Sequence, residues 1–410
     1  MSENGTNIEN KNTGSHTPQL RFPGFTEEWV ERQLKNSFDE RTEKNRCDLP
    51  LLSLGEEGLV YQSDTARKDN SNADKSKYLR VAIGDIAYNT MRMWQGRCAC
   101  AEIEGIVSPA YTVCKPKNGI DSVFHYYLFK TNRMIQLFHQ NSQGLVNDTL
   151  NLKYEAFSRI RYLLPPTLPE QQRIAGCLSE LDNLITAQGQ KVDVLKEKKK
   201  GLMQQMFPQK GETVPRLRFP GFTKEWDYVN GNELFMPISN KDHNSDLPIL
   251  ALTQDKGAVP REMINYNVVV SDKSVAGYKV VEVDDFIISL RSFQGGIEYS
   301  RYKGLCSSAY IVLRKKKKDL SSDFYRIFFK SFIFIQELNK NLEGIRDGKM
   351  ISYHQFSEIK LPKPSPEEQQ IIAECLSALD DTITAEAEKL EALRNHKKGL
   401  MQQLFPQPAK

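Results

Sequence analysis

The sequence has 410 residues with 56 lysines and arginines against 52 acidic residues, so its formal net charge is +4. This length is typical of two or three domains, and the content of 39% hydrophobic and 10% aromatic residues excludes a chain that is disordered throughout. No run approaches about 18 apolar residues, which excludes a transmembrane helix. A charge of this size does not by itself indicate a nucleic-acid partner.

The start of the chain and its cysteines indicate the cellular setting. Residues 1–17 are rich in Asn, Ser, Gly and Thr and lack the apolar core of a signal peptide, so we expect a disordered tail. The seven cysteines form no CxxC pair, and Cys98 and Cys100 alone are not a zinc-binding pattern. We therefore expect reduced thiols, no bound metal and a cytoplasmic location.

The most informative feature of the sequence is an internal duplication. Three pairs of nearly identical segments show it: LRFPGFTEEW (20–29) and LRFPGFTKEW (217–226), EQQRIAGCLSELD (170–182) and EQQIIAECLSALD (368–380), and GLMQQMFPQ (201–209) and GLMQQLFPQ (399–407). This period is far longer than a solenoid unit of roughly 20–50 residues. We therefore expect two duplicated domains related by a pseudo-twofold axis.

Each half begins with a body whose sequence has diverged from its counterpart. Short apolar runs separated by Gly, Asn, Asp and Pro favour strands; these runs are 79–83, 86–88, 110–113, 268–270, 286–290 and 310–313. An aromatic-rich stretch near the end of each body, at 123–138 and 324–338, predicts a helix. The bodies are therefore predicted to be α+β, each with a compact sheet.

Each half ends in a long predicted helix. The patterns T-x-x-E at 167–170 and S-x-x-E at 365–368 predict capping boxes at the helix starts, and Pro208 and Pro406 follow the helix ends. Apolar residues then recur at alternating steps of four and three, which is the heptad pattern of a coiled coil. The central seam positions are Leu181, Ile185, Val192, Leu195 and Lys199 in the first helix and Leu379, Ile383, Glu386, Leu390 and Leu393 in the second.

The polar interruptions of this seam favour antiparallel pairing. In a parallel pair in register Lys199 would face Lys397, and the two ammonium groups would repel each other. In an antiparallel pair Lys199 can face Glu386 and Gln188 can face Lys397, while every apolar layer stays apolar. We predict an antiparallel two-helix coiled coil roughly 55 Å long. The alternative is two separate amphipathic helices, each packed on its own body.

The chain resembles the specificity (S) subunit of type I restriction–modification enzymes. The segments LPPTLPEQQRIAGCLSELD, KKGLMQQLFPQ and LRFPGF resemble the repeated parts of that family, and residues 84–113 (GDIAYNTMRMWQG…SPAYTV) resemble its target-recognition domains. The resemblance covers nearly the whole chain after Pro18. It implies a tail (1–17), a first target-recognition domain (18–166), a first spacer helix (167–208), a second target-recognition domain (209–364), a second spacer helix (365–406) and a short tail (407–410).

The resemblance also implies a function. Each target-recognition domain would read one half of a split, asymmetric site in double-stranded DNA, and the helices would set the spacer between the halves. Two methyltransferase (M) subunits would dock on the repeated helical regions, and two restriction (R) subunits would join through the M2S core. This chain would bind no cofactor, whereas S-adenosylmethionine, ATP and Mg²⁺ would bind to the partner subunits. A rod of roughly 55 Å can span half-sites one DNA turn, about 34–36 Å, apart.

Two matching loops are the first candidates for contact with bases. Arg92 and Arg291 each precede an aromatic residue and a Gln-Gly pair; Arg can bind guanine and Gln can bind adenine in bidentate fashion. The candidate DNA-binding residues are Arg92, Trp94, Gln95, Arg97, Asn147, Asn151 and Lys153 in the first body and Arg291, Phe293, Gln294, Arg301, Arg346, Lys349 and His354 in the second. The alternative is structural: Trp94 and Phe293 would be core aromatics, and the two arginines would pair with carboxylates.

No catalytic signature is present in the sequence. It contains no Gly-x-Gly-x-x-Gly fingerprint, no Gly-x4-Gly-Lys-Ser/Thr phosphate loop and no Asn/Asp-Pro-Pro-aromatic motif of amino-methyltransferases. We therefore expect the chain not to be an enzyme by itself. Two alternatives are a free-standing DNA methyltransferase or nuclease and a purely structural coiled-coil scaffold.

Overall fold

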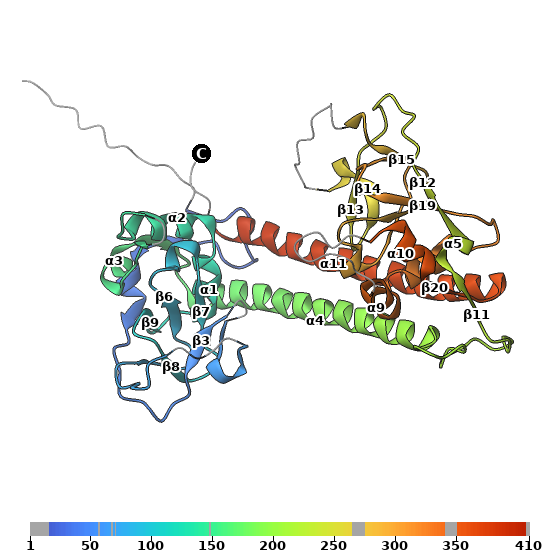
Figure 1. The fold of residues 1–410 in the computed structure, drawn as a ribbon. Coiled ribbons are helices and arrows are strands. Elements are labelled where there is room, and N and C mark those ends of the chain that lie inside the picture. Colours follow the sequence, from blue (N-terminus) through green and yellow to red (C-terminus); the bar gives the residue numbers. More distant parts are fainter. Residues whose placement is uncertain are drawn as a thin grey trace, which may run out of the picture. The chain divides into compact units, whose positions relative to one another are not determined.

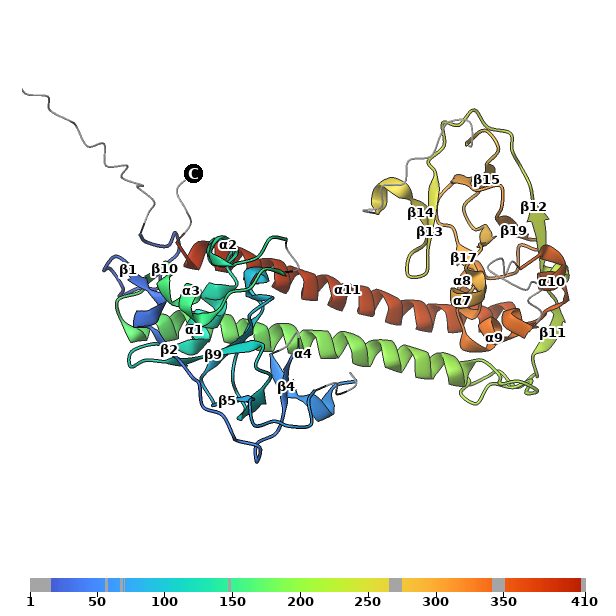
Figure 2. The same ribbon diagram turned by 60° about the vertical axis from the view of Figure 1, so that its left-hand side comes forward.

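A computed structural model describes residues 16–55, 58–66, 69, 71–146, 149–264, 275–340 and 351–406. The chain forms two compact units (Figure 1): unit 1 comprises Met1–Gln188 and Lys389–Lys410, and unit 2 comprises Gly189–Glu388. Two helices of 39 residues, α4 (Leu168–Met206) and α11 (Pro366–Leu404), each contribute to both units. Figures 1 and 2 show α4 in green and α11 in red as continuous helices.

Unit 1 is built around a four-stranded antiparallel sheet in the order β2-β9-β6-β7. Three two-stranded antiparallel pairs, β1–β10, β3–β4 and β5–β8, complete its strands. The bounds are β1 (Val30–Gln33), β2 (Phe38–Glu40), β3 (Leu52–Leu54), β4 (Leu59–Tyr61), β5 (Leu79–Val81), β6 (Ile86–Asn89), β7 (Cys98–Cys100), β8 (Gly105–Val107), β9 (Tyr111–Pro116) and β10 (Arg161–Leu164), with 3-10 turns η1 (Leu34–Asn36), η2 (Gln62–Asp64) and η3 (Met93–Gln95).

Three short helices of unit 1 contribute aromatic side chains to its core. They are α1 (Ser122–Phe129), α2 (Asn132–Asn141) and α3 (Tyr154–Arg159). The prediction of a single helix over 123–138 is wrong because Thr131 interrupts it: its hydroxyl accepts the N–H of Met134 at 3.4 Å and so caps a new helix. The interruption lets both helices turn their aromatic side chains into one core, which contains Phe124, Phe129, Phe138 and Phe157.

Unit 2 repeats this arrangement with the sheet order β12-β19-β16-β17. The predicted α+β duplication is therefore confirmed, although the predicted strand 286–290 ends at Ile288 and the run 268–270 lies outside the described residues. The bounds are β11 (Asp227–Asn230), α5 (Gly231–Leu234), β12 (Phe235–Ile238), β13 (Leu250–Thr253), β14 (Gly257–Pro260), η5 (Arg261–Met263), β15 (Lys279–Val281), β16 (Phe286–Ile288), α7 (Ser292–Gly295), β17 (Glu298–Tyr299), β18 (Gly304–Cys306), β19 (Ile311–Lys315), α8 (Ser322–Phe328), α9 (Phe332–Lys340), α10 (Tyr353–Glu358) and β20 (Lys360–Lys363).

The glutamates of the two predicted capping boxes have another role. Glu170 is buried and accepts hydrogen bonds from Arg21 at 2.8 and 2.9 Å, and Arg218 binds Glu368 in the same way at 2.7 and 2.9 Å. Ser365 Oγ accepts the N–H of Glu368 at 3.3 Å, so one half of a box is formed there. The prediction of reciprocal boxes is wrong for these glutamates, because a bidentate guanidinium pair is stronger than a bond to one backbone N–H.

Within unit 2 the segments of α4 and α11 run antiparallel. Lys199 Nζ lies 2.5 Å from Asp380 Oδ1, and Lys191 Nζ lies 3.0 Å from Glu386 Oε1, so the later residue of α11 pairs with the earlier residue of α4. The predicted seam positions of both helices are buried or half-buried in their units, whereas most of the residues between them are exposed. The predicted antiparallel orientation is confirmed.

The register of the two helices differs from the prediction by about one heptad. Lys199 pairs with Asp380 and not with Glu386. In unit 1 Lys397 Nζ lies 2.5 and 2.7 Å from the two carboxylate oxygens of Asp182, which is the equivalent pair. Charge matching along the seam does not distinguish registers one heptad apart, because a lysine side chain reaches carboxylates beside the seam as well as across it.

The ends of the helices decide the register because they are buried in the cores of the bodies. Leu404 and Phe405, at the end of α11, belong to the core of unit 1, where the Phe405 ring lies 5.6 Å from that of Phe124. Met206 and Phe207, at the end of α4, occupy the same place in the core of unit 2. A slide of one heptad would keep the seam apolar but would withdraw these side chains from both cores.

His125 is the central buried polar group of unit 1. Its Nδ1 lies 2.7 Å from the carbonyl oxygen of Asp121, and its Nε2 lies 2.9 Å from the hydroxyl of Tyr162, which is hydrogen bonded to Ser37. Burial lowers the pKa of His125 to about 4. At the equivalent position of α8, unit 2 has Tyr325, whose hydroxyl donates to a backbone carbonyl at 2.9 Å.

Truncation of Phe405 to alanine is expected to destabilise unit 1 by about 3–5 kcal/mol, because it leaves a cavity in the aromatic core. Hydrogen exchange of the α1 amides measures the loss. Phe207→Ala is the matched variant and is expected to reduce protection in α8 of unit 2 instead. If each variant reduced hydrogen-exchange protection equally in α1 and α8, the assignment of Phe405 to the core of unit 1 and of Phe207 to the core of unit 2 would be contradicted.

The stability of unit 1 is expected to fall as the pH drops from about 6.5 toward 4. The pKa of His125 is lower in the folded than in the unfolded state, so the unfolded chain binds the proton first and stability is complete only above this window. At pH 5 the loss is roughly 2 kcal/mol. His125→Phe should flatten the pH dependence of α1 hydrogen-exchange protection, and Tyr325→Phe should not. An unchanged pH dependence in His125→Phe would contradict this assignment.

Candidate nucleic-acid interface

The Arg92 loop, residues 90–97, joins β6 to β7 in unit 1. Its backbone closes into the turn η3, in which the N–H of Arg92 donates to Asn89 O at 2.9 Å and the N–H of Gly96 donates to Met93 O at 2.8 Å. Gly96 has a φ of +73°, and a Cβ there would lie 3.1 Å from the side chain of Ile135. The loop is therefore held in one conformation that requires glycine at its end.

The Arg291 loop, residues 289–296, is the equivalent segment of unit 2. Arg291 precedes the short helix α7 with φ −113° and ψ 5°, close to the φ −128° and ψ −2° of Arg92. Gly296 ends the turn with a φ of +80°, and a Cβ there would overlap the carbonyl oxygen of Phe329. Both arginines thus leave the backbone at the same point of the same turn.

Lys130 of unit 1 and Lys330 of unit 2 occupy equivalent positions but have different hydrogen-bond partners. In unit 2 Lys330 Nζ donates to the carbonyl of Gly295 at 3.0 Å and to Glu298 Oε1 at 2.6 Å, so it holds the Arg291 loop from the inside. Burial raises the pKa of Glu298, and the Lys330 ammonium opposes that shift. In unit 1 Lys130 Nζ instead donates to the hydroxyl of Tyr126 at 2.7 Å.

The arginine and glutamine side chains of both loops have no partners in the described part of the chain. There, no side-chain hydrogen bond or ion pair involves the polar groups of Arg92, Gln95, Arg97, Arg291 and Gln294. Arg92 is half-buried, and the other four side chains are exposed. The alternative that Arg92 and Arg291 pair with carboxylates therefore does not hold among the described residues.

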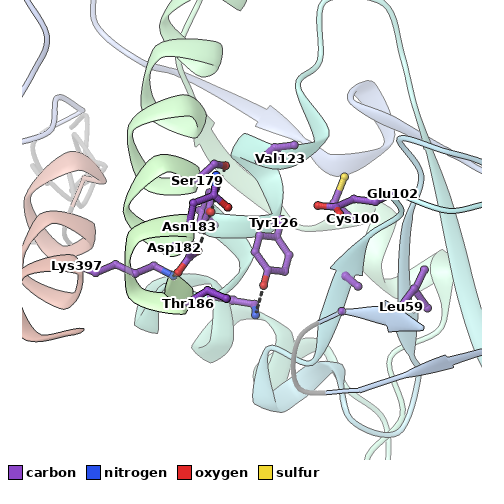
Figure 3. A pocket seen from close by; sticks show the side chains of 14 residues that line it. Leu59, Cys100, Glu102, Val123, Tyr126, Ser179, Asp182, Asn183, Thr186 and Lys397 are labelled. Carbon is purple, nitrogen blue, oxygen red and sulfur yellow. Dashed lines mark hydrogen bonds and ion pairs between the residues drawn. The ribbon is translucent and has the colours of Figure 1, made fainter. Parts of the chain in front are cut away.

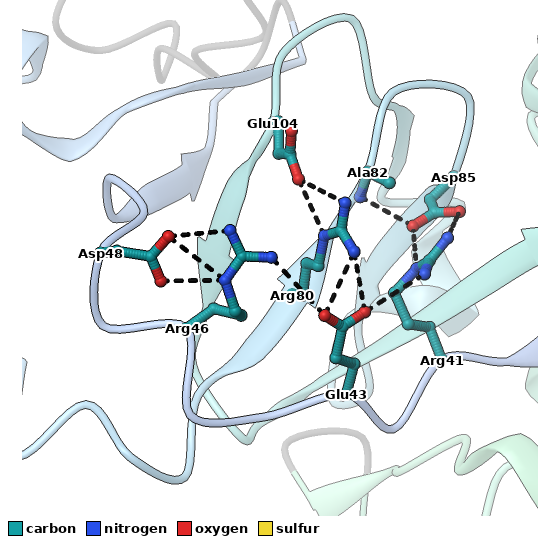
Figure 4. Close-up of polar contacts among 8 residues, drawn as sticks. All are labelled: Arg41, Glu43, Arg46, Asp48, Arg80, Ala82, Asp85 and Glu104. Carbon is teal, nitrogen blue, oxygen red and sulfur yellow. Dashed lines mark hydrogen bonds and ion pairs between the residues drawn. The ribbon is translucent and has the colours of Figure 1, made fainter.

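Other arginines of unit 1 differ from these because they form ion pairs (Figure 4). The pairs are Arg41–Asp85, Arg80–Glu43, Arg80–Glu104 and Arg46–Asp48, with closest distances of 2.6, 3.0, 2.6 and 2.8 Å. Asp85 is buried and also accepts the N–H of Ala82 at 2.8 Å. Unit 2 repeats that site with Asp285, which Arg314 binds at 2.7 Å. These arginines stabilise the body, and those of the two loops are available for another partner.

The aromatic residues of the two loops act as anchors. Trp94 Nε1 donates to Met91 O at 3.0 Å, and its ring meets that of His139 edge-on at 5.8 Å. In unit 2 Asn339 Nδ2 donates to the carbonyl of Phe293 at 2.7 Å, and the Phe293 side chain packs half-buried against the core. These contacts attach the loops to α2 and α9. A direct contact of either aromatic ring with DNA stays a prediction.

The structure brings the segment before α3 to the Arg92 loop. The N–H of Leu152 donates to Thr90 O at 2.9 Å, which places Asn151 and Lys153 on either side of this contact. Lys153 is exposed, and Asn151 Oδ1 is buried without a hydrogen-bond partner among the described residues. Two separate sets of sequence candidates therefore lie at one surface of unit 1.

The remaining candidates lie after β17, on α10 or outside the described residues. Arg301 is exposed beyond the far end of β17 from the Arg291 loop, and it lines a cavity of about 790 Å³ in unit 2. His354 is exposed on α10, where its Nε2 lies 3.6 Å from Glu358. Asn147, Arg346 and Lys349 lie outside the described residues. Their roles stay predictions.

An equivalent cavity of about 520 Å³ lies between the body and the helices of unit 1. Figure 3 shows side chains that line it. Its polar groups bind one another: Asp182 accepts from Lys397 at 2.5 and 2.7 Å and from the Tyr127 hydroxyl at 2.8 Å.

In neither unit do the described residues include three or more His, Cys, Asp or Glu side chains grouped to hold a metal ion. None of the described helices combines the length and the apolar character that a membrane span requires.

The chain is similar to known proteins in both of its halves. The family called "Type I restriction modification DNA specificity domain" matches residues 26–197 and again 224–395. Two relatives from Methanocaldococcus jannaschii are each 25% identical to this chain. The putative type I restriction enzyme MjaX specificity subunit aligns over 92% of this chain and 93% of its own length, and the type I restriction enzyme MjaVIII specificity subunit over 87% and 88%.

Solved structures share the fold. The S subunit of a type I restriction–modification system from M. genitalium is 16% identical, with a TM-score of 0.56 over 96% of this chain and 100% of that one. A chain from a study of complex assembly and conformational transition of the type I R-M system is 15% identical, with a TM-score of 0.57 over 96% and 100%. Because the two family matches together cover most of the sequence, the chain belongs to the type I restriction–modification specificity family and is a DNA sequence-specificity subunit that is not an enzyme by itself.

Proposed function

We propose that the body of each unit reads one half of a split, asymmetric DNA site through the Arg92 loop and the Arg291 loop. The observation that carries this proposal is the pair of arginines at equivalent points of two equivalent turns, without partners among the described residues. Arginine is the commonest side chain in specific contacts with guanine. The loops differ in sequence around the shared arginine and glutamine, so the two half-sites would differ too.

The two long helices would set the number of base pairs between the half-sites. Each has 39 residues and is about 58 Å long at 1.5 Å per residue. Ion pairs and buried helix ends hold one register in each unit. A spacer of defined length is what a protein needs in order to reject half-sites that lie at the wrong separation.

The repeated segments would form two equivalent docking surfaces for methyltransferase subunits. In unit 1 the N–H of Leu20 donates to Gln403 O at 3.0 Å, and in unit 2 the N–H of Leu217 donates to Gln205 O at 2.9 Å, so each LRFPGF segment is attached to the end of a long helix. Two equal surfaces fit two copies of one partner. Restriction subunits would join through this M2S core, and S-adenosylmethionine, ATP and Mg²⁺ would bind to the partners. With chromosomal DNA as its target, the chain would act in the cytoplasm.

Replacing Arg92 with alanine is expected to weaken specific DNA binding of the assembled complex by about 1–3 kcal/mol and to relax sequence preference in one half-site. Arg291→Ala should do the same in the other half-site. Arg394→Ala removes the same charge from an exposed ion pair with Glu391 on α11 and should leave binding unchanged. Titration of labelled duplexes at fixed salt measures these effects. Equal losses at both half-sites for each variant would exclude separate readers.

Lengthening both helices by one heptad is expected to widen the gap of the methylated motif by about three base pairs, from 1.5 Å per residue and 3.4 Å per base pair. The insertions belong between Gln188 and Gly189 and between Glu388 and Lys389, at the boundary of the two units. Mapping of N6-methyladenine in cells that carry the chain and its methyltransferase measures the gap. A variant with one insertion only should fail to assemble. An unchanged gap in the double variant would contradict the spacer role.

A further inference from the structure

An exposed apolar side chain directly precedes the arginine in each loop. Met91 is 42% exposed and Leu290 is 45% exposed. Isolated apolar residues on a surface are ordinary. These two differ from that background because they stand at the same place in two bodies whose sequences have diverged, each beside a guanidinium group without a partner among the described residues.

The backbone on which these side chains stand is fixed. The N–H of Met91 donates to Asn89 Oδ1 at 2.9 Å, and its carbonyl accepts from Trp94 Nε1 at 3.0 Å. In unit 2 the N–H of Arg291, which follows Leu290, donates to Ser289 Oγ at 3.2 Å. A side chain on a backbone of defined conformation loses less entropy when it is ordered by a ligand, so it is suited to a specific contact.

The chemistry of the DNA groove limits what such a side chain can recognise. The base edges in the major groove present hydrogen-bond donors and acceptors, and the one apolar group among them is the 5-methyl of thymine. Arginine contacts the same groove through guanine. An apolar residue next to the arginine therefore matches a thymine methyl close to the base pair that the arginine contacts.

We propose that Met91 and Leu290 are specificity-determining residues, each of which contacts the 5-methyl group of a thymine in its own half-site. This inference rests on the proposed function of the two loops. It assigns the apolar contact to Met91 and Leu290 and leaves Trp94 and Phe293 as anchors, in accord with the contacts of the two aromatic residues.

The test uses the complex assembled with its methyltransferase and a duplex that carries the mapped site. Each thymine is replaced singly by deoxyuridine, which removes only the methyl group. One replacement in each half-site is expected to weaken binding about four-fold, from ~0.8 kcal/mol for a buried group of this size. Met91→Ala should abolish the effect in one half-site and keep it in the other, and Leu290→Ala should do the reverse.

The controls are exposed apolar residues of the long helices. Leu184→Ala in unit 1 and Val194→Ala in unit 2 change side chains that are 51% and 67% exposed and should keep both deoxyuridine effects. The inference is overturned by a half-site without an A·T pair, by binding that ignores every replacement, or by alanine variants that keep the wild-type sensitivity. Failure of the wild-type complex to prefer its mapped site would overturn the proposed function, and this inference with it.

Discussion

The burial of each helix end in the core where the other helix begins is the constraint on which the structure depends. Unit 1 is completed by Leu404 and Phe405 beside Ile174 and Leu178 of α4, and unit 2 by Met206 and Phe207 beside Ile372 and Leu376 of α11. This exchange requires antiparallel helices in each unit and excludes other registers, because a shifted helix would leave a core unfilled. The buried pairs Arg21–Glu170 and Arg218–Glu368 strengthen the same junctions.

The same constraint explains which parts of the duplication are preserved. The segments that repeat almost without change, LRFPGF, EQQ and GLMQQ, are the ones that meet at these junctions. Outside these segments, equivalent buried aspartates pair with arginines that come from different positions in the two bodies. The buried Asp85 receives Arg41, which follows β2, whereas the equivalent Asp285 receives Arg314 of β19. The bodies can therefore change sequence while their sheets and junctions persist, which suits a protein that reads two unlike half-sites.

Electrostatics separates the arginines of the bodies into two groups. Those that hold strands together are bound to carboxylates in bidentate fashion, and those of the two loops have no described partner. A guanidinium group that no carboxylate binds keeps all of its N–H donors available for a base edge. The difference follows from position, because the buried Asp85 and Asp285 directly precede β6 and β16, whereas the two loops follow the opposite ends of these strands.

The duplication, the α+β bodies, the long helices and their antiparallel orientation were determined by the sequence alone, because near-identical segments and a sustained heptad pattern are local signals. The tertiary structure decided the register, since the seam pattern favoured a register one heptad away and the burial of the helix ends in the two cores selects the observed one. It also decided the partner of Glu170, the break at Thr131 and the roles of the loop residues.

Arg92 and Arg291 were identifiable from matching motifs, but the anchoring of Trp94 and the exposure of Met91 depend on α2 and on turn hydrogen bonds. Such contacts join residues that sequence spacing alone does not bring together.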